Sequence, residues 1–258
     1  MANAPVEVLT AGVLQGIAHG FLGRRGGAST GALAGLNVGL GAGDQDDAVA
    51  ENRNRAVAAV LPGAHLVTVY QVHSPDCVLV QAPWRTADRP QADAMVTKQP
   101  GVVLGIVTAD CAPVLLADRE AGVIGAAHAG WRGALHGVTD QTIAAMESLG
   151  ARRNRIAAAV GPCIAMASYE VDAAFRDTFC AASSENAAFF ATGAPNHWQF
   201  DLSGYLLQRL KTSGIGAIAA LSEDTYTQPE RFYSYRRATH RGEATYGRQL
   251  ALIGLEGA

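Results

Sequence analysis

Three short apolar runs lie close together in the segment Gly101–Gly133, and they constrain the fold more than any other part of the chain. Their bounds are Val102–Val107, Pro113–Ala117 and Val123–Ala127. Apolar runs of this length, separated by turn-forming residues, are typical of strands and are too short for most helices. We therefore expect three strands in succession, with a tight turn at Arg119–Gly122 before the third.

Helical and strand-like patterns alternate along the rest of the chain. Apolar residues at helical spacing predict helices at Asp46–Leu61, Ala134–Leu149, Val171–Cys180 and Leu202–Thr212. Apolar runs or alternation predict further strands at Val6–Leu9, Leu66–Tyr70, Ile156–Val160, Ile215–Leu221, Phe232–Arg237 and Gln249–Leu255. This interleaving is typical of an α/β protein with mixed sheets.

The composition favours one large domain, which we expect to span residues 1–258. The chain is 49% hydrophobic and 17% charged, and no Pro/Ser-rich linker or internal repeat divides it. A formal net charge of −3 gives no electrostatic basis for a nucleic-acid partner. The chain begins without the basic and apolar regions of a signal peptide, and no apolar stretch is long enough for a membrane span. We therefore expect a cytoplasmic protein with no membrane partner.

Candidate metal ligands follow three of the predicted strands. Cys111 and His128 come directly after the first and third of the three runs, and His73 follows the strand predicted at Leu66–Tyr70. The four cysteines show no CxxC pairing, so we expect free thiols rather than disulfides. One thiol and two imidazoles suit Zn²⁺ with a fourth position open to water or substrate, and an open position indicates catalysis.

Simple packing is the alternative for each of these residues taken alone. A single cysteine in an apolar strand is more often a small buried hydrophobe, and a single histidine is more often a hydrogen-bonded core or surface residue. The neighbouring residues favour a site. Asp110 precedes Cys111 in an apolar context, and the turn Gly130–Gly133 after His128 carries a cation. Polar residues in such surroundings need partners, which a functional site supplies.

The loop His19–Gly27 combines several glycines with Arg24 and Arg25. Glycines permit unusual backbone angles beside the two cations, so this loop could cradle an anion. A solvated surface turn is an equal alternative.

Nine short motifs occur in an order that resembles one known family. They are HGFLGRRGG (His19–Gly27), GLNVG (Gly35–Gly39), QVHS (Gln71–Ser74), ADAMVT (Ala92–Thr97), TADCAPVLLAD (Thr108–Asp118), AAHAGWRG (Ala126–Gly133), GPCI (Gly161–Ile164), YEV (Tyr169–Val171) and FYSYRR (Phe232–Arg237). Over nearly the whole chain they closely resemble the YfiH family, also called the laccase-domain or multicopper polyphenol oxidase family.

The resemblance implies a fold, a metal site and an activity. The fold is a single-domain, mixed-sheet α/β/β/α sandwich, and the implied Zn²⁺ ligands are His73, Cys111 and His128. Family members are described as purine nucleoside enzymes that cleave adenosine, inosine and methylthioadenosine with phosphate, giving the free base and (methylthio)ribose 1-phosphate. They are also described as deaminating adenosine. Bacterial members have been linked to peptidoglycan precursor editing, and the fold is compared with cysteine hydrolases.

These activities suggest roles for further residues. In deamination an acid must protonate the departing ammonia, and Asp110 is the candidate, with capping of the turn beside Cys111 as the alternative. Phosphorolysis needs groups that bind substrate and phosphate, and the candidates are Arg24, Asn37, Arg132 and Arg236. Of these, Arg132 is the strongest because it lies four residues from His128. An aromatic pair at Phe232 and Tyr233 could stack on a purine or lie in the core.

Three other functions stay open. A copper polyphenol oxidase is disfavoured because the chain has only seven histidines and no His-x-His pair, although Cu²⁺ could occupy a thiol/imidazole site. A metal-free cysteine amidohydrolase would use His128 to activate Cys111 as nucleophile. A binding module would retain the metal pocket without catalysis. The expected partners are purine nucleosides and phosphate, and a homodimer is the assembly considered.

Overall fold

The computed structural model describes residues 5–257, and its framework is a pair of mixed sheets. The six-stranded sheet has the order β13 (Ala217–Ala220), β9 (Ala157–Val160), β7 (Ala112–Asp118), β8 (Val123–Ala129), β5 (Ala94–Thr97) and β4 (Cys77–Leu79). The five-stranded sheet has the order β1 (Val8–Leu9), β2 (Ala18–Leu22), β14 (Gln249–Gly254), β6 (Val102–Thr108) and β3 (His65–Val67). Each sheet contains parallel and antiparallel pairs.

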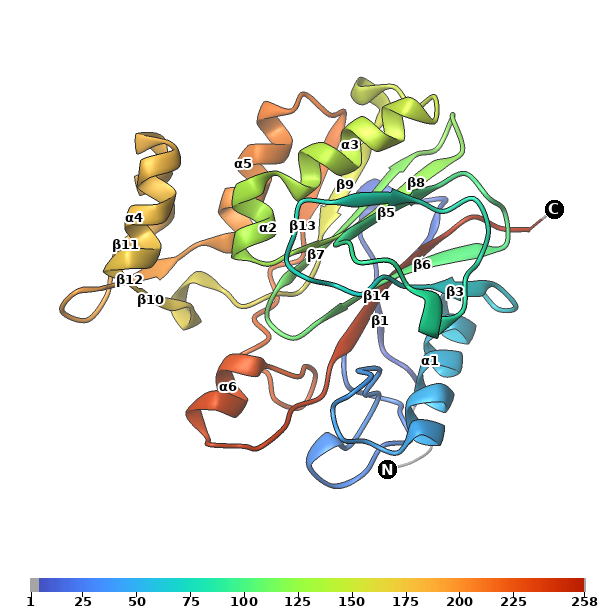
Figure 1. Ribbon diagram of the computed structural model, residues 1–258, viewed down its shortest axis with the longest axis horizontal. Coiled ribbons are helices and arrows are strands. Elements are labelled where there is room, and N and C mark those ends of the chain that lie inside the picture. The colour runs from blue at the N-terminus through green and yellow to red at the C-terminus, as the bar shows by residue number, and fades with distance from the viewer. Residues whose placement is uncertain (1–4, 258) are drawn as a thin grey trace.

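The two sheets pack face to face, and helices cover their outer faces (Figure 1). In β7 the side chains of Leu115 and Ala117 enter the core between the sheets, whereas Val114 and Leu116 face the opposite way. Burial on both faces explains why this strand is a continuous apolar run.

Helices α2 (Trp131–His136), α3 (Val138–Ser148) and α5 (Leu202–Thr212) lie on the outer side of the six-stranded sheet, and α1 (Asp46–Val60) lies on the outer side of the five-stranded sheet. The layers are therefore α/β/β/α, and the expected α/β class is confirmed.

Two smaller parts complete the described chain. A three-stranded sheet of β10 (Glu170–Asp172), β12 (His197–Phe200) and β11 (Phe190–Thr192) packs with α4 (Ala173–Ala182) at one end of the molecule (Figure 1). The short helix α6 (Tyr235–His240) precedes the final strand β14. No helix among residues 5–257 has the length and apolar character that crossing a membrane requires.

Several expected elements differ from the structure, and the strand expected at Leu66–Tyr70 is found at His65–Val67. The helix expected at Ala134–Leu149 begins earlier and is two helices, because Gly137 adopts the left-handed conformation (φ 90°) that ends α2. The strand expected at Phe232–Arg237 is wrong. Ser234 instead caps α6, and its hydroxyl accepts a hydrogen bond from Arg237 N at 3.1 Å. The expected helix Val171–Cys180 starts two residues later, because Asp172 caps it and the preceding residues form β10.

Candidate functional site

The side chains of His73, Cys111 and His128 meet in one place. Their potential ligand atoms all lie within 4.8 Å of one another, and the two imidazole rings are 4.9 Å apart at an interplanar angle of 74°. His128 is buried in β8, Cys111 is partly buried, and His73 is exposed. The structure therefore brings together the three residues that the sequence suggested as a set, and we call them the Cys/His cluster.

Two connections between the sheets supply two of these three residues. Cys111 lies where the chain passes from β6 in the five-stranded sheet to β7 in the six-stranded sheet. His73 lies on the connection from β3 to β4, which crosses between the same two sheets. The cluster is thus located at the edge where the sheets exchange chain segments, and His128 joins it from within a central strand.

Strained backbone marks both connections. His73 (φ 62°) and Asp110 (φ 85°) are two of the three non-glycine residues with positive φ among residues 5–257. Such conformations cost about 1–3 kcal/mol each and persist where surrounding contacts impose them. The contacts that hold each residue are therefore part of the site.

Asp93 holds the His73 connection and orients His128. Its buried carboxylate accepts hydrogen bonds from the backbone amides of Val72 and Ser74 at Oδ2, at 3.0 and 2.7 Å. Its Oδ1 accepts one from Nδ1 of His128 at 2.7 Å. When the His128 ring is neutral and donates Nδ1–H to Asp93, its other ring nitrogen carries the lone pair that a metal ion or a proton can take.

Asp110 holds the second connection. Its Oδ1 accepts a hydrogen bond from the hydroxyl of Thr225 at 2.6 Å. Its Oδ2 accepts from the hydroxyl of Ser234 at 2.9 Å and from the backbone amide of Arg236 at 2.7 Å. Burial raises the pKa of the Asp110 carboxyl above its usual value, and these donors together with the charge of Arg237 offset only part of that effect. Asp110 thereby fixes Arg236 beside Cys111.

The Cys/His cluster favours a thiolate next to an imidazolium in the absence of a metal. Burial opposes ionisation of the Cys111 thiol, but the charges and hydrogen bonds of His128 and His73 outweigh it and lower its pKa to about 6. Burial likewise opposes protonation of His128, but Cys111 and Asp93 outweigh it and raise the His128 pKa to about 9. A thiolate is the form of cysteine that binds metal and attacks electrophiles.

The donor set fits a catalytic Zn²⁺ site. It has one sulfur and two nitrogens, with one imidazole oriented by a buried carboxylate as in many zinc proteins. Gly130 makes room for the cluster, because a Cβ there would lie 2.9 Å from Cδ2 of His73 and 3.1 Å from Sγ of Cys111. Three protein ligands leave one coordination position for a further ligand.

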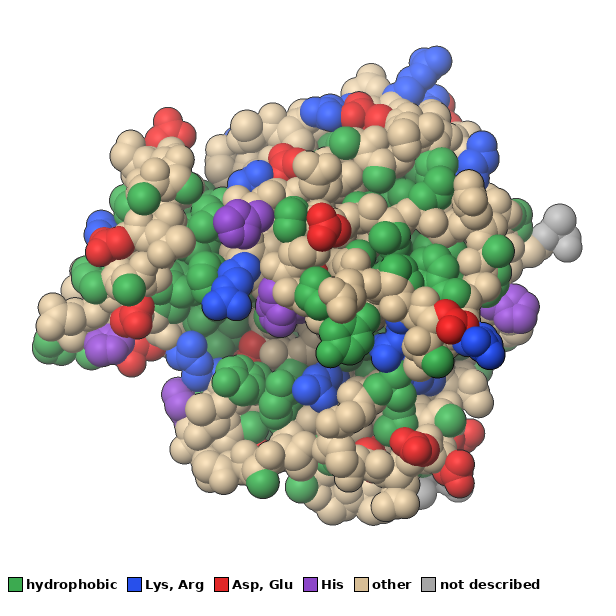
Figure 2. Space-filling view, in the orientation of Figure 1, with side chains coloured by type: hydrophobic (Ala, Val, Ile, Leu, Met, Phe, Trp, Pro, Cys, Tyr) green, Lys and Arg blue, Asp and Glu red, His purple; other side chains and the backbone are tan. Residues whose placement is uncertain are grey.

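Two cavities open onto the Cys/His cluster and share His73, Ala109 and Cys111 in their walls. Cavity 1 has a volume of about 470 Å³, and its other lining residues include Asp110, Trp131, Arg132, Tyr169, Glu170, Asp172, Phe175, Tyr235 and Arg236. Cavity 2 has a volume of about 320 Å³, and its other lining residues include Arg53, Tyr70, Gln71, Arg89, His128, Tyr246 and Arg248. Figure 2 shows histidine and basic side chains gathered near the centre of the displayed face.

The residues suggested for substrate or phosphate divide into two groups. Arg132 and Arg236 line cavity 1. Cζ of Arg132 lies 4.9 Å from the ring centre of Trp131, and Cζ of Arg236 lies 5.3 Å from the ring centre of Tyr169. Arg236 also donates a hydrogen bond to the carbonyl of Glu170 at 2.8 Å.

Arg24 and Asn37 line neither cavity. Arg24 donates to the carbonyls of Ala34 and Pro229 and stacks on Tyr233, so each of its three side-chain nitrogens already has a partner within the protein. Asn37 is fully buried and donates to the carboxylate of Asp44 at 2.7 Å. Phosphate binding by these two residues stays a prediction.

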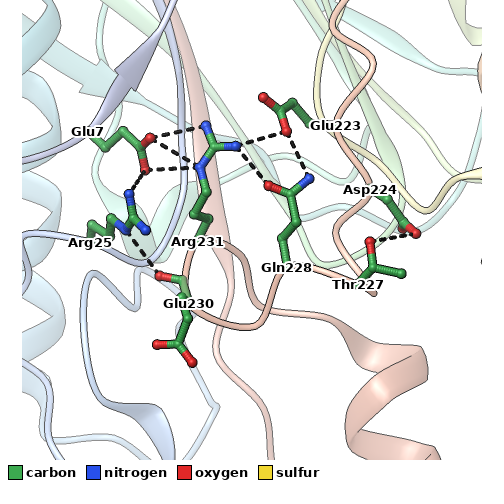
Figure 3. A network of polar contacts seen from close by, with 8 residues as sticks. All are labelled: Glu7, Arg25, Glu223, Asp224, Thr227, Gln228, Glu230 and Arg231. Carbon is green, nitrogen blue, oxygen red and sulfur yellow. Dashed lines mark hydrogen bonds and ion pairs between the residues drawn. The ribbon is translucent and has the colours of Figure 1, made fainter.

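Other residues of the glycine loop and of the FYSYRR motif form structural contacts. Arg25 pairs with Glu7 at 3.3 Å, in a network that also joins Glu7 to Arg231 (Figure 3). Phe232 and Tyr233 are buried, which agrees with the core alternative for this pair.

Sequence reasoning missed the residues that position the site residues through hydrogen bonds. Asp93 at the start of an apolar strand was a usable signal, because a charge in such a run needs a buried partner. Thr225 and Ser234 gave no comparable signal, since they are 115 and 124 residues from the Asp110 carboxylate that they contact.

Comparison with known proteins shows relatives along nearly the whole chain. A Deinococcus radiodurans protein named purine nucleoside phosphorylase is 42% identical over 242 residues, covering 93% of this chain and 89% of that protein. A Streptomyces griseus protein, purine nucleoside phosphorylase ORF3, is 38% identical over 244 residues, covering 93% and 96%.

Solved structures with the same fold include two bacterial proteins. The Neisseria meningitidis protein NMB0706 is 32% identical with a TM-score of 0.87, covering 98% of this chain and 100% of that one. The Bacillus licheniformis hypothetical protein YfiH is 26% identical with a TM-score of 0.87, covering 99% and 98%. Residues 18–256 match the family model described as multi-copper polyphenol oxidoreductase laccase. The chain therefore belongs to this laccase-like family, the YfiH family that its motifs resemble.

Proposed function

We propose that this protein is a zinc-dependent purine nucleoside enzyme that splits adenosine, inosine and methylthioadenosine with phosphate and also deaminates adenosine. The observation that carries the proposal is the Cys/His cluster at the meeting point of two cavities, in a chain whose relatives are named purine nucleoside phosphorylase. His73, Cys111 and His128 are the proposed ligands. When bound there, Zn²⁺ supplies a Lewis acid with an open coordination position.

Cavity 1 has the properties expected of a nucleoside site. Trp131, Tyr169, Phe175 and Tyr235 give its wall aromatic faces on which a purine can stack, which stabilises binding by about 1–3 kcal/mol per base. Carboxylates at Glu170 and Asp172 can accept hydrogen bonds from ribose hydroxyls. Arg132 and Arg236 are proposed to bind the substrate from the same wall.

The phosphorolysis step needs no oxidant or reductant. A phosphate oxygen forms a bond to the ribose carbon C1′ while the bond from C1′ to the purine nitrogen breaks, and the nitrogen takes the electron pair and a proton. For deamination, Asp110 is the proposed proton donor to the departing ammonia. Its raised pKa suits an acid, although its contacts with Thr225, Ser234 and Arg236 N also give it a positioning role.

A product assay tests this function. Purified protein of known zinc content would be incubated with each nucleoside, with and without phosphate, and the products separated by chromatography. We expect free base and ribose 1-phosphate only when phosphate is present, and inosine from adenosine under either condition. If neither the base nor inosine forms with the zinc-loaded protein, the proposed function is wrong.

A cysteine amidohydrolase is a second candidate, because one observation favours it. The opposite pKa shifts of Cys111 and His128 describe a thiolate–imidazolium pair, which is the resting state of many cysteine nucleophiles. Peptidoglycan precursors are the substrate class suggested for such an activity in this family. Hydrolysis of these amides that survives complete removal of zinc by a chelator would favour this function, whereas loss that zinc alone restores would favour the metal site.

Copper oxidase chemistry is the least supported of the proposals. One group of three histidine, cysteine or acidic donors converges within residues 5–257, whereas coupled copper centres require many more histidines. Metal analysis of protein purified without added metal distinguishes zinc from copper.

A further inference from the structure

Cavity 2 contains an unusual concentration of positive charge. Three of its lining residues are arginines, Arg53, Arg89 and Arg248, and none of its described lining residues is an aspartate or glutamate. Within residues 5–257, no carboxylate lies within ion-pair distance of these three guanidinium groups. Like charges in one partly enclosed cavity repel each other, so this arrangement favours an anion taken from solution.

The three guanidinium groups keep most of their hydrogen-bond donors free. Arg53 uses Nε on the carbonyl of Val38 at 3.0 Å, and Arg89 uses Nε on the carbonyl of Thr86 at 2.7 Å. Arg248 uses Nη2 on the hydroxyl of Tyr246 at 3.3 Å. Nη1 of Arg248 is a buried atom with no hydrogen-bond partner. A buried charged donor without a partner is costly, whereas the Nη groups of Arg53 and Arg89 make no hydrogen bond within the described part of the chain and can reach a ligand oxygen.

Arg231 lies outside cavity 2 and has carboxylate partners. Arg231 pairs with Glu7 at 3.0 Å and with Glu223 at 2.8 Å, and it also donates to the side chain of Gln228 (Figure 3). Arg53, Arg89 and Arg248 differ from Arg231 in that three such cations line one cavity without a described carboxylate beside them.

The GLNVG motif builds one wall of cavity 2. Oδ1 of Asn37 accepts hydrogen bonds from the backbone amides of Gly39 and Arg248, at 3.1 and 3.0 Å. The next residue, Val38, supplies the carbonyl that Arg53 contacts. A Cβ on Gly39 would lie 3.0 Å from both Cδ and Nη1 of Arg248. The buried Asn37 and the missing side chain of Gly39 therefore fix where two of the arginines lie.

The electrostatics agree with this arrangement. Burial and the charge of Arg89 lower the pKa of Arg53 to about 10, which still leaves it protonated near neutral pH. Arg53 therefore keeps its charge, and no aspartate or glutamate in the described cavity wall offsets it. Arginine forks match the oxygens of a tetrahedral phosphate in paired hydrogen bonds.

We propose that cavity 2 is a phosphate-binding subsite in which Arg53, Arg89 and Arg248 hold a phosphate group beside the Cys/His cluster. This inference rests on the proposed phosphorolysis and assigns its phosphate to three arginines that were not among the candidates from the sequence. A volume of about 320 Å³ is several times the ~30 Å³ that one water takes in the liquid, so it admits a phosphate and part of a sugar. The group is either inorganic phosphate or the phosphate of ribose 1-phosphate.

Direct binding measurements test the assignment without relying on turnover. Inorganic phosphate and ribose 1-phosphate would be titrated separately into the zinc-loaded protein by calorimetry, at one fixed ionic strength because salt screens charge. The variants are Arg89→Gln and Arg248→Gln in cavity 2, and Arg132→Gln in cavity 1. The matched control is Arg85→Gln, since Arg85 lies four residues from Arg89 but is exposed and paired with Asp88. Zinc content and thermal melting would confirm that each variant is folded.

We expect each cavity 2 variant to weaken phosphate binding by about tenfold or more, and Arg85→Gln to leave it unchanged. If only ribose 1-phosphate binds and the same variants weaken it, the subsite is supported and its ligand is the sugar phosphate. Binding that Arg132→Gln weakens while both cavity 2 variants leave it unchanged would place phosphate in cavity 1 and overturn the inference. Failure of both ligands to bind the wild-type protein would also overturn it.

The same data separate this inference from the proposed function. Phosphate binding that depends on Arg89 and Arg248, in a protein that releases no base from any nucleoside, would retain the subsite and reject phosphorolysis. Phosphate-dependent base release that is indifferent to both arginines would retain phosphorolysis and reject the subsite.

Discussion

Cavity 1 and cavity 2 share His73 and Cys111 of the Cys/His cluster but differ in the charge of their remaining walls. Cavity 1 combines Arg132 and Arg236 with three carboxylates and several aromatic rings, so its charges are nearly balanced. Cavity 2 combines three arginines with no carboxylate. A balanced aromatic wall suits a neutral nucleoside, whereas an unbalanced cationic wall suits an anion. The comparison supports the proposal that nucleoside and phosphate bind in different cavities and meet at the cluster.

The largest expected loss of activity comes from replacing Cys111, which lines both cavities. Cys111→Ala removes the thiolate donor, so we expect zinc content to fall to near zero and nucleoside turnover to fall below detection, whichever cavity the ligand uses. Metal analysis and the product assay measure both quantities on the same sample. A folded Cys111→Ala variant with normal turnover would contradict the zinc mechanism.

Asp93→Asn tests the support behind the cluster. The variant keeps the shape of the side chain but loses the negative charge of the carboxylate. That carboxylate orients His128 and accepts hydrogen bonds from two backbone amides near His73. We expect zinc affinity to fall by about 10–100-fold, the range observed when such supporting carboxylates are lost. Competition with a chromogenic chelator measures this affinity. An unchanged affinity would show that the contact serves stability alone.

Tyr169→Leu tests the aromatic side of the comparison. Loss of one stacking face in cavity 1 should raise the KM for nucleoside by about tenfold, because stacking on an aromatic ring stabilises a base by about 1–3 kcal/mol. The KM for phosphate should stay the same. Steady-state kinetics with each substrate varied in turn give both values, and a rise in the KM for phosphate alone would reverse the assignment of the two cavities.

Gly39→Ala is the mildest test and concerns cavity 2. The new Cβ would meet Cδ and Nη1 of Arg248 at 3.0 Å, so the arginine must shift by a few tenths of an ångström. We expect the KM for phosphate to rise about two- to threefold, consistent with a loss below 1 kcal/mol, while the KM for nucleoside stays the same. The matched control is Gly12→Ala, because a Cβ at Gly12 would meet no atom within 4 Å. Gly41→Ala is unsuitable as a control, because Gly41 has a φ of 77° and an alanine there would strain the backbone.

The sequence predicted the strands of the fold better than its connections. β6, β7 and β8 are found where the three apolar runs predict them, because burial on both faces leaves a continuous apolar pattern. That β6 and β7 belong to different sheets had no local signal. Gly137 was read as part of a helix, since a glycine that ends a helix and one that a helix tolerates look alike in a single sequence.

The same contrast applies to the site. Cys111 and the two histidines could be grouped from the sequence because few residue types bind zinc and each follows an apolar run. The arginines of cavity 2 could not be grouped. Arg53 lies on α1, where a charged residue resembles any solvated helix face, and Arg89 and Arg248 lie in segments far from it along the chain. Only the folded chain brings these charges to one cavity.

The location of the cluster on the two connections between sheets has a consequence for stability. His73 and Cys111 each lie on a segment that passes from one sheet to the other, and His128 lies in a strand of the second sheet. An ion held by all three donors would tie both connections to β8 at the edge where the sheets exchange chain segments. Since a ligand bound only by the native state stabilises it by mass action, the melting temperature should rise with free zinc concentration, and heat inactivation should coincide with loss of the metal.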